Sequence, residues 1–116
     1  MRDHYIFNYI LNDANEPEPC EDMAAWEVWF ESDERRILRQ QTFVSERPHA
    51  LHQHVTVSTI FLGIDHNSGE GDLPVLWETQ TYIDGAVHNT WRYTSRAEAI
   101  LGHNYAVVWH GGEALD

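Results

Sequence analysis

In the first 44 residues, the pattern of hydrophobic and polar positions predicts two strands and one helix. Residues 4–11 are rich in aromatic and β-branched side chains and lead into a polar turn, which is typical of a strand. Pro17 and Pro19 then argue against regular structure until a helix begins, and we expect this helix near residues 20–32. Its apolar positions share one helical face and are Met23, Trp26, Trp29 and Phe30. Residues 35–44 are polar at alternate positions and predict a second strand.

The second half of the chain predicts three further strands and a final helix. The densest run of Val, Thr, Ile and Phe lies in residues 54–64 and is the clearest strand signal. Residues 74–83 and 86–94 flank the dipeptide Asp84-Gly85, which is the strongest short-range signal for a β-hairpin with a type I′ turn. A helix over residues 95–110 follows this hairpin.

The last helix carries its own start and stop signals. Ser95 and Glu98 form a capping box, and Gly111 ends the helix. The apolar positions that follow the cap at helical spacing, which we expect to face the core, are Ala97, Ile100, Leu101, Tyr105 and Val108. The order of elements, strand, helix, four strands and helix, predicts an α+β fold. In it a mostly antiparallel sheet of about five strands packs both helices on one face.

The tight turn also predicts which residues share a face of the sheet. It pairs Glu78 with Trp91, and a preceding hairpin that places Phe61 beside Glu78 completes the register. The expected core face holds Val55, Val57, Phe61, Leu76, Tyr82, Val87, Trp91 and Tyr93. The opposite face holds Ser58, Ile60, Leu62, Trp77, Thr79, Thr81, His88 and Arg92. Because Trp77 would lie there beside Ile60 and Leu62, we predict that a partner or a second copy covers this face. A slip of one residue would exchange the two faces.

Charge changes the picture at the N-terminal end. Residues 1–34 contain ten acidic side chains and one basic one, hence a local net charge of −9 out of −12 for the whole chain. A field of several kT is expected to attract a basic partner. The chain has no Lys and only seven Arg, so it lacks the cations that neutralise phosphates, and we exclude nucleic acid as a direct partner. The predicted binding residues of this segment are Asp13, Glu16, Glu18, Glu21, Asp22, Glu27, Glu31, Asp33 and Glu34.

The composition limits the number of domains, the redox compartment and the association with a membrane. With 116 residues and 42% hydrophobic side chains, the chain is expected to fold as a single domain over residues 1–116. Its one cysteine, Cys20, excludes an internal disulfide and fits a reducing compartment. No apolar run approaches the roughly 20 residues that span a membrane, and the first residues do not open a signal peptide. We therefore expect a cytoplasmic protein without a membrane partner.

Three segments carry a family resemblance: VSTIFLGIDHN from residue 57, PVLWET from residue 74 and WRYTSRAEAILGH from residue 91. Their order and spacing resemble a small family encoded in tailed-phage genomes and prophages. That family combines a Leu-Gly-x-Asp-His-Asn turn, a Leu-x-Glu-Thr strand and an Arg-Tyr capped helix with Gly-His near its middle. The resemblance covers roughly residues 20–108 and implies a phage origin and a compact accessory protein, with no established activity. The acidic first 34 residues and the histidines at positions 49, 52 and 54 depart from the family pattern, so we expect them to be features of this chain alone.

His49, His52 and His54 are the candidate metal ligands. An alternating pair of histidines in a strand points both imidazoles to one side, and with Asp65 they could ligate zinc or iron. Only two of these ligands are certain to converge, and a solvated loop explains the same residues. We therefore predict that no transition metal and no cofactor is bound.

A candidate acid–base group consists of Asp65-His66 and Glu78. The register places Glu78 away from this turn, so we expect Asp65 and Asn67 to stabilise the turn through hydrogen bonds to the backbone. Glu78 would be buried and needs an Arg or a Tyr hydroxyl as a partner. The chain also lacks phosphate-binding and nucleophile motifs, and we predict that it is not an enzyme.

Three functions remain open at this point. The first is an interaction protein whose acidic end binds a basic host protein or nucleoprotein complex, in the manner of a DNA mimic or an anti-CRISPR-like inhibitor of host defence or regulation. The second is a small metal-dependent enzyme that uses the histidines. The third is a structural homodimer, which is compatible with the first. The acids could also serve only to keep the protein in solution.

Overall fold

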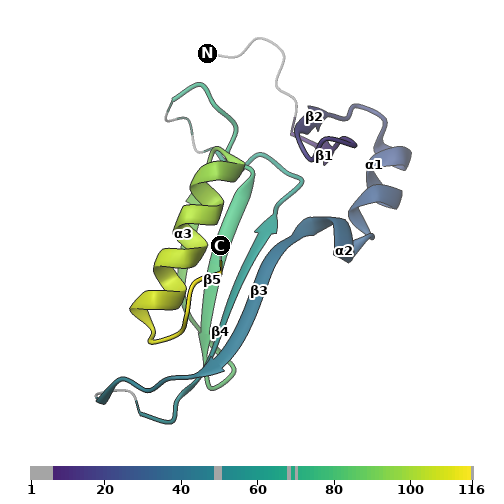
Figure 1. The fold of residues 1–116 in the computed structure, drawn as a ribbon. Coiled ribbons are helices and arrows are strands. Elements are labelled where there is room, and N and C mark those ends of the chain that lie inside the picture. The colour runs from purple at the N-terminus through teal and green to yellow at the C-terminus, as the bar shows by residue number, and fades with distance from the viewer. Residues whose placement is uncertain (1–6, 49–50, 68, 70, 116) are drawn as a thin grey trace.

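The computed structural model describes residues 7–48, 51–67, 69 and 71–115. Within them the fold is α+β, as the sequence predicts, with a four-stranded antiparallel sheet, a two-stranded sheet and three helices. The elements are β1 (Tyr9–Leu11), β2 (Pro17–Pro19), α1 (Met23–Phe30), α2 (Asp33–Arg36), β3 (Ile37–Val44), β4 (His54–Phe61), β5 (Trp77–Ile83), β6 (Ala86–Tyr93) and α3 (Arg96–Trp109). Figure 1 shows α3 along one face of the large sheet, and β1, β2, α1 and α2 grouped beyond one end of it. This arrangement gives an elongated molecule of 51 × 29 × 26 Å.

The large sheet is a meander in which each strand pairs with the next along the chain, in the order β3-β4-β5-β6. The predicted Asp84-Gly85 hairpin is confirmed. Both residues have positive φ, 50° and 87°, which a type I′ turn requires. The Asp84 carboxylate also accepts a hydrogen bond from the backbone N–H of His54 (3.0 Å), so the hairpin turn is joined to the start of β4.

Two of the predicted register assignments in the sheet are wrong, and the one between β4 and β5 reverses the predicted faces of β5. In β6 a bulge shifts the register between Thr81 and Tyr82, so that His88 lies opposite no residue of β5. Glu78 therefore pairs with Arg92 and not with Trp91. The hairpin between β4 and β5 also differs by one residue from the prediction, since Phe61 pairs with Trp77. Among the residues assigned to the open face, the structure buries Leu62, Trp77, Thr79 and Thr81. Among those assigned to the core, it exposes Val87 and Trp91 and half-buries Tyr82.

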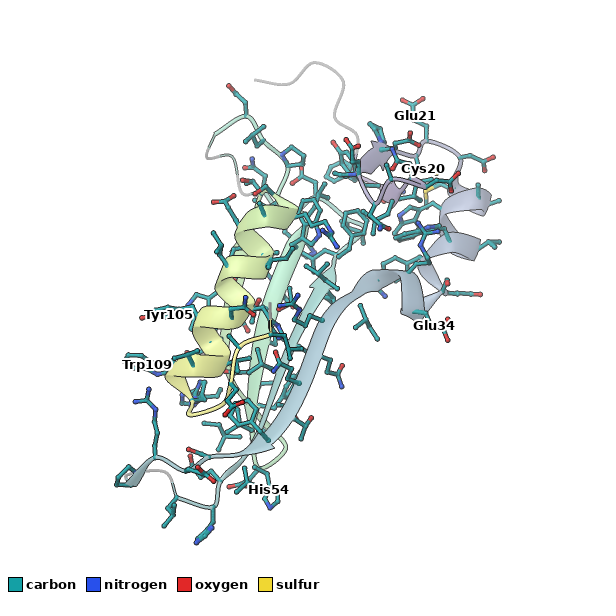
Figure 2. The ribbon with its side chains drawn as sticks, in the orientation of Figure 1. Cys20, Glu21, Glu34, His54, Tyr105 and Trp109 are labelled. Carbon is teal, nitrogen blue, oxygen red and sulfur yellow. The ribbon has the colours of Figure 1, made fainter. Side chains whose placement is uncertain are left out.

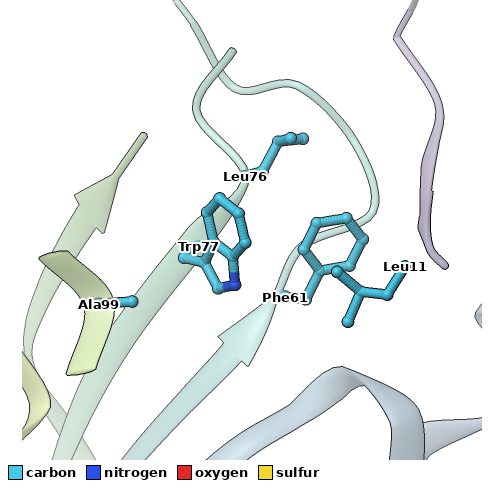
Figure 3. Close-up of a cluster of buried hydrophobic side chains, with 5 residues drawn as sticks. All are labelled: Leu11, Phe61, Leu76, Trp77 and Ala99. Carbon is cyan, nitrogen blue, oxygen red and sulfur yellow. The ribbon is translucent and has the colours of Figure 1, made fainter. Parts of the chain in front are cut away.

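The core consists of two apolar clusters beneath α3. The first contains Leu11, Phe61, Leu76, Trp77 and Ala99 (Figure 3). Its Phe61 and Trp77 rings meet edge to face, with centroids 5.4 Å apart. The second contains Val55, Val57, Ala106 and Val107, with Phe43 packed against it. Leu11 of β1 belongs to the first cluster, so the N-terminal elements share apolar packing with the large sheet.

α3 begins as predicted but presents a different face to the sheet. The Ser95 hydroxyl accepts a hydrogen bond from the backbone N–H of Glu98 (3.1 Å), which confirms the cap. The side chains that are buried are Ala99, His103, Ala106 and Val107. Of the residues expected to face the core, Ala97, Leu101, Tyr105 and Val108 are exposed. The helix lies close to β6 because Gly102 adjoins the Tyr93 ring, with which any Cβ at this position would collide.

The N-terminal elements also differ from the sequence expectation. The predicted strand over residues 4–11 is described only from residue 7, and β1 covers its end. Pro17 and Pro19 lie in β2, where the sequence predicts no regular structure. At the two ends of the β1–β2 pair, the backbone N–H of Asn12 donates to the carbonyl of Glu16 (2.9 Å) and that of Cys20 donates to the carbonyl of Asn8 (2.8 Å). On the β2 side these bonds fall on residues that alternate with the two prolines. No proline N–H is needed, so a short edge strand tolerates both.

Both helices near residue 30 are short. α1 ends at Phe30, and α2 forms a single turn before β3, where the sequence predicts a strand from residue 35 onward. α1 contacts β1 and does not lie on the sheet face that α3 covers.

Candidate functional site

The acidic residues lie on a small unit, residues 7–36, which we call the N-terminal module. Its hairpin turns around Asn12, whose side-chain oxygen accepts hydrogen bonds from the backbone N–H groups of Ala14 (2.8 Å) and Glu16 (3.0 Å). Such an Asx turn reverses the chain without a glycine. The turn thereby holds Asp13 and Glu16 at the solvent-exposed end of the hairpin.

α1 attaches the module to the sheet through its buried face. The Trp26 indole N–H donates to the backbone carbonyls of Gly63 (3.0 Å) and Tyr9 (3.2 Å), and its ring stacks on Phe30 at 4.5 Å. Gly63 has a φ of 73°, and a Cβ there would press on the Phe30 ring at 3.1 Å. The backbone of Gly63 therefore approaches α1 as only glycine can. Asp22 starts the helix by accepting a hydrogen bond from the backbone N–H of Ala25 (3.1 Å).

The two arginines of the module form further hydrogen bonds to the backbone. Arg35 donates to the carbonyls of Leu11 (3.2 Å) and Asn12 (3.1 Å). Arg36 donates to the carbonyl of Phe61 (3.3 Å), and its guanidinium lies 3.8 Å over the Phe30 ring. With Arg96 and the single acid Glu34 they line a pocket of about 170 Å³ where the module meets the sheet. The positive charge of the module is therefore directed toward this seam.

Eight acidic side chains of the module are exposed, and we call them the acidic surface. They are Asp13, Glu16, Glu18, Glu21, Asp22, Glu27, Glu31 and Glu34. Figure 2 shows Glu21 and Glu34 projecting from this end of the molecule, far from Tyr105 and Trp109 on α3. The ninth predicted residue, Asp33, begins α2, and its side chain lies outside the described part of the structure. The structure thus brings the predicted acidic residues onto one compact unit.

Trp77, the remaining predicted binding residue, lies elsewhere. Only 2% of its surface is exposed, and it packs in the first apolar cluster against Phe61. The face away from α3 instead carries Thr42, Thr56, Ser58, Gln80 and Thr90, with Ile60 half-buried among them. Among the described residues of this face there is therefore no large exposed apolar patch of the kind that the sequence predicts, because the β4–β5 register places Trp77 opposite Phe61 on the α3 side of the sheet.

The candidate metal ligands do not form a cluster among the residues that the structure describes. His49 lies outside these residues, while His52 and His54 are exposed. Within the described ranges no group of three His, Cys, Asp or Glu side chains is placed to hold a metal. The histidines that do meet are His88 and His110, with ring centroids 5.5 Å apart. A pair falls short of the three protein ligands that even an open zinc site uses.

The Asp65 turn has the structural role that the sequence predicts. Asp65 accepts hydrogen bonds from the backbone N–H groups of Asn67 (2.8 Å) and Val75 (2.9 Å). Asn67 in turn donates to the carbonyl of Leu73 (2.7 Å). Glu78 is buried on the open side of the sheet and forms an ion pair with Arg92 at 3.0 Å, which confirms the expected arginine partner.

Between the two apolar clusters lies a polar layer that sequence reasoning missed. The fully buried His103 joins the Thr59 hydroxyl (2.7 Å) and the Gln41 side-chain oxygen (2.8 Å), and Thr59 joins Thr79 (2.6 Å). Burial, and secondarily the charge of Arg39, lowers the pKa of His103 to about 4. The imidazole is therefore neutral at pH 7. Because His103, Thr59 and Thr79 are fully enclosed, this group has no access for a substrate, and it orders the core.

The C-terminal residues close the edge of this layer. Gln41 donates to the backbone carbonyl of Glu113 (3.0 Å), and Arg39 donates to that of Leu115 (3.2 Å) and to the Asn104 side chain (2.9 Å). The only sequence signal for this group is the Gly-His pair in the helix, whose histidine lies on the face that the large apolar residues leave free.

Comparison of the chain with protein-family models, with curated proteins and with solved structures finds no match. Function is therefore inferred from the residues themselves. Among the described helices, none has the length and apolar character needed to cross a membrane.

Proposed function

We propose that the protein binds a basic protein surface through the acidic surface of the N-terminal module, and that this binding competes with nucleic acid for the same partner. One observation carries the proposal. Eight exposed acidic side chains are gathered on a unit of about 30 residues that is fixed to the sheet by Trp26 and Arg36. An array with a fixed geometry resembles the ordered charges along a nucleic-acid backbone.

The clustering of the acids on a module that is held to the sheet argues against a purely solubilising role. Charges that serve solubility can be scattered, as five exposed acids of the other described residues are, whereas eight are gathered on the N-terminal module. Repulsion among neighbouring carboxylates opposes folding, and a basic partner would compensate for it. The phage setting that the resemblance implies fits this mode of action, because a small acidic protein can block a nucleic-acid-binding protein of host defence or regulation.

Charge reversal at exposed positions tests the proposal. The probe is a basic DNA-binding protein carrying a fluorescent DNA duplex, from which the wild-type chain should displace the DNA. The double variant Glu21→Lys with Glu27→Lys should weaken this displacement about tenfold or more, because it removes two positions of the array and adds repulsion. Both residues are exposed and neither caps a helix.

A matched control keeps the change in net charge equal. Glu46→Lys with Glu113→Lys alters two exposed acids outside the module and should change displacement less than threefold, which corresponds to roughly 0.6 kcal/mol. Displacement should also fall steeply as salt is raised. If the two double variants lose activity equally, only the total charge matters and the proposal is wrong. Asp22 is left out because its loss would also remove the cap of α1.

A further inference from the structure

The outer face of α3 carries an apolar stripe that the fold does not use. Leu101, Tyr105, Val108 and Trp109 recur at i, i+4, i+7 and i+8, and 71%, 67%, 51% and 56% of their surfaces are exposed. We call these four residues the α3 stripe. Figure 2 shows Tyr105 and Trp109 projecting from α3 away from the sheet. Their rings stack on each other at 6.2 Å, which makes this end of the stripe a flat aromatic surface.

The α3 stripe exposes more apolar surface area than an ordinary solvent-facing side of a helix. One aromatic side chain carries about 150–250 Å² of surface, so the four residues expose on the order of 400–500 Å² together. Apolar patches of a few hundred Å² mark interaction sites. Two such stripes facing each other would bury roughly 1,000 Å² in total, which reaches the lower range of specific protein–protein interfaces.

Charge indicates which partner fits. Residues 99–109 contain no Asp, Glu, Lys or Arg, and their one histidine, His103, is buried. A basic partner has no reason to choose this face, because the acidic surface lies at the other end of a molecule 51 Å long. A cation adjoins one end of the stripe, since the Arg47 guanidinium lies 5.8 Å from the centre of the Trp109 ring. Two copies of a chain with a net charge of −12 repel each other, and they repel least at a surface whose own residues include no acidic side chain.

The spacing of the stripe also suits a twofold interface. Leu101 and Trp109 lie four residues before and after Tyr105. Two antiparallel copies of α3 with the twofold axis at Tyr105 would place Leu101 of one copy against the partner's Trp109, and the reverse. We propose that the α3 stripe is the interface of a homodimer, with a second copy of this chain as its occupant and with both acidic surfaces pointing outward.

Analytical ultracentrifugation of the full chain tests the assembly. The wild type should be dimeric above a dissociation constant in the micromolar range, and dimerisation should strengthen as salt screens the repulsion. Val108→Glu should raise that constant about a hundredfold, because it places two carboxylates in the interface. Val28→Glu is the matched control, an equally simple change at an exposed valine of α1, and should leave the dimer intact.

A cross-link tests the geometry. In a Cys20→Ser background, Tyr105→Cys should form a disulfide-linked dimer on mild oxidation, whereas Val28→Cys should not. A wild type that stays monomeric well above micromolar concentration overturns the proposal and leaves the stripe to another macromolecule. A dimer that persists in Val108→Glu, or that fails to cross-link through residue 105, overturns it as well. The opposite salt dependences separate this result from that of the acidic surface, which should bind more weakly in salt.

Discussion

α1 and α3 both pack against the sheet, but α1 buries large aromatic residues and α3 buries mostly small ones. α1 turns its two largest residues, Trp26 and Trp29, toward the sheet and leaves charged Glu27 and Glu31 in water. α3 buries small residues such as Ala99 and Ala106 and leaves Tyr105 and Trp109 in water. The space beneath each helix decides the orientation. α1 meets the end of the sheet near Phe61 and Gly63 and has room there for indole rings, whereas α3 lies flat along the sheet, with Gly102 against Tyr93. A helix that buries its small residues leaves its large apolar residues exposed, where they are available for contact with a partner.

The largest expected effect comes from removing the residue that fixes the module. Trp26→Ala should lower the free energy of unfolding by about 3–5 kcal/mol, because it leaves a cavity and removes the indole hydrogen bonds to Tyr9 and Gly63. Urea unfolding followed by far-UV circular dichroism measures this change. DNA displacement by the acidic surface should fall with it, because the array loses its fixed geometry.

Val28→Ala on the same helix is the control. This side chain is 74% exposed, so its truncation should change the free energy of unfolding by less than about 0.5 kcal/mol. A loss below about 1 kcal/mol in Trp26→Ala would show that the indole is not what holds the module on the sheet.

The next effect belongs to the core beneath α3 and depends on pH. Burial lowers the pKa of His103 to about 4, whereas its value in the unfolded chain is near 6.5. Between these two pH values the unfolded chain binds a proton that the folded chain does not. The stability conferred by the neutral imidazole is therefore complete above pH 6.5 and is lost as pH falls toward 4, by roughly 3 kcal/mol.

Urea unfolding at pH 7 and at pH 4.5 measures this dependence. Many carboxylates titrate in the same window, so the wild type is compared with His103→Gln, which retains a polar side chain without the titrating imidazole. The variant should lose less stability on acidification than the wild type. His66→Gln replaces an exposed histidine and should behave as the wild type does. Equal pH dependences in all three proteins would contradict a neutral, buried His103.

Local signals in the sequence were sufficient for the turns and caps. Asp84-Gly85, the Ser95 cap and the Asp65 turn were all predicted and confirmed, because each depends on a few neighbouring residues whose chemistry determines the backbone. The acidic segment was likewise visible in the sequence, since charge is read directly. Its arrangement on one fixed unit was not, because the contact between Trp26 and Gly63 spans 37 residues.

Assignments of faces failed where they depended on distant packing. The bulge at His88 has no Gly or Pro to mark it. The long connection between β4 and β5 likewise leaves the register of that pair open, and a difference of one residue there moves Trp77 from the open face into the core. In α3 two sets of residues have helical spacing, the large apolar ones and the set that includes Ala99 and Ala106. Hydrophobicity favoured the former, whereas the close approach of the helix to the sheet selected the latter.

The smallest expected effect compares the caps of the two helices. Ser95→Ala should cost about 1 kcal/mol, because it leaves the backbone N–H of Glu98 without its partner at the start of α3. Asp22→Ala also loses a cap, at Ala25, but it removes one carboxylate from among the seven others of the acidic surface. Relief of that repulsion should offset part of the loss, so at low salt Asp22→Ala should cost less than Ser95→Ala.

Salt provides the decisive measurement for this comparison. The Debye length falls from about 10 Å at 0.1 M to about 3 Å at 1 M, so the repulsion around Asp22 is screened while the hydrogen bond to Ala25 is not. The cost of Asp22→Ala should therefore rise toward that of Ser95→Ala when urea unfolding is repeated at high salt. If the cost is the same at both salt concentrations, the acidic surface carries no strain from its own charge, and a central argument for a basic partner is lost.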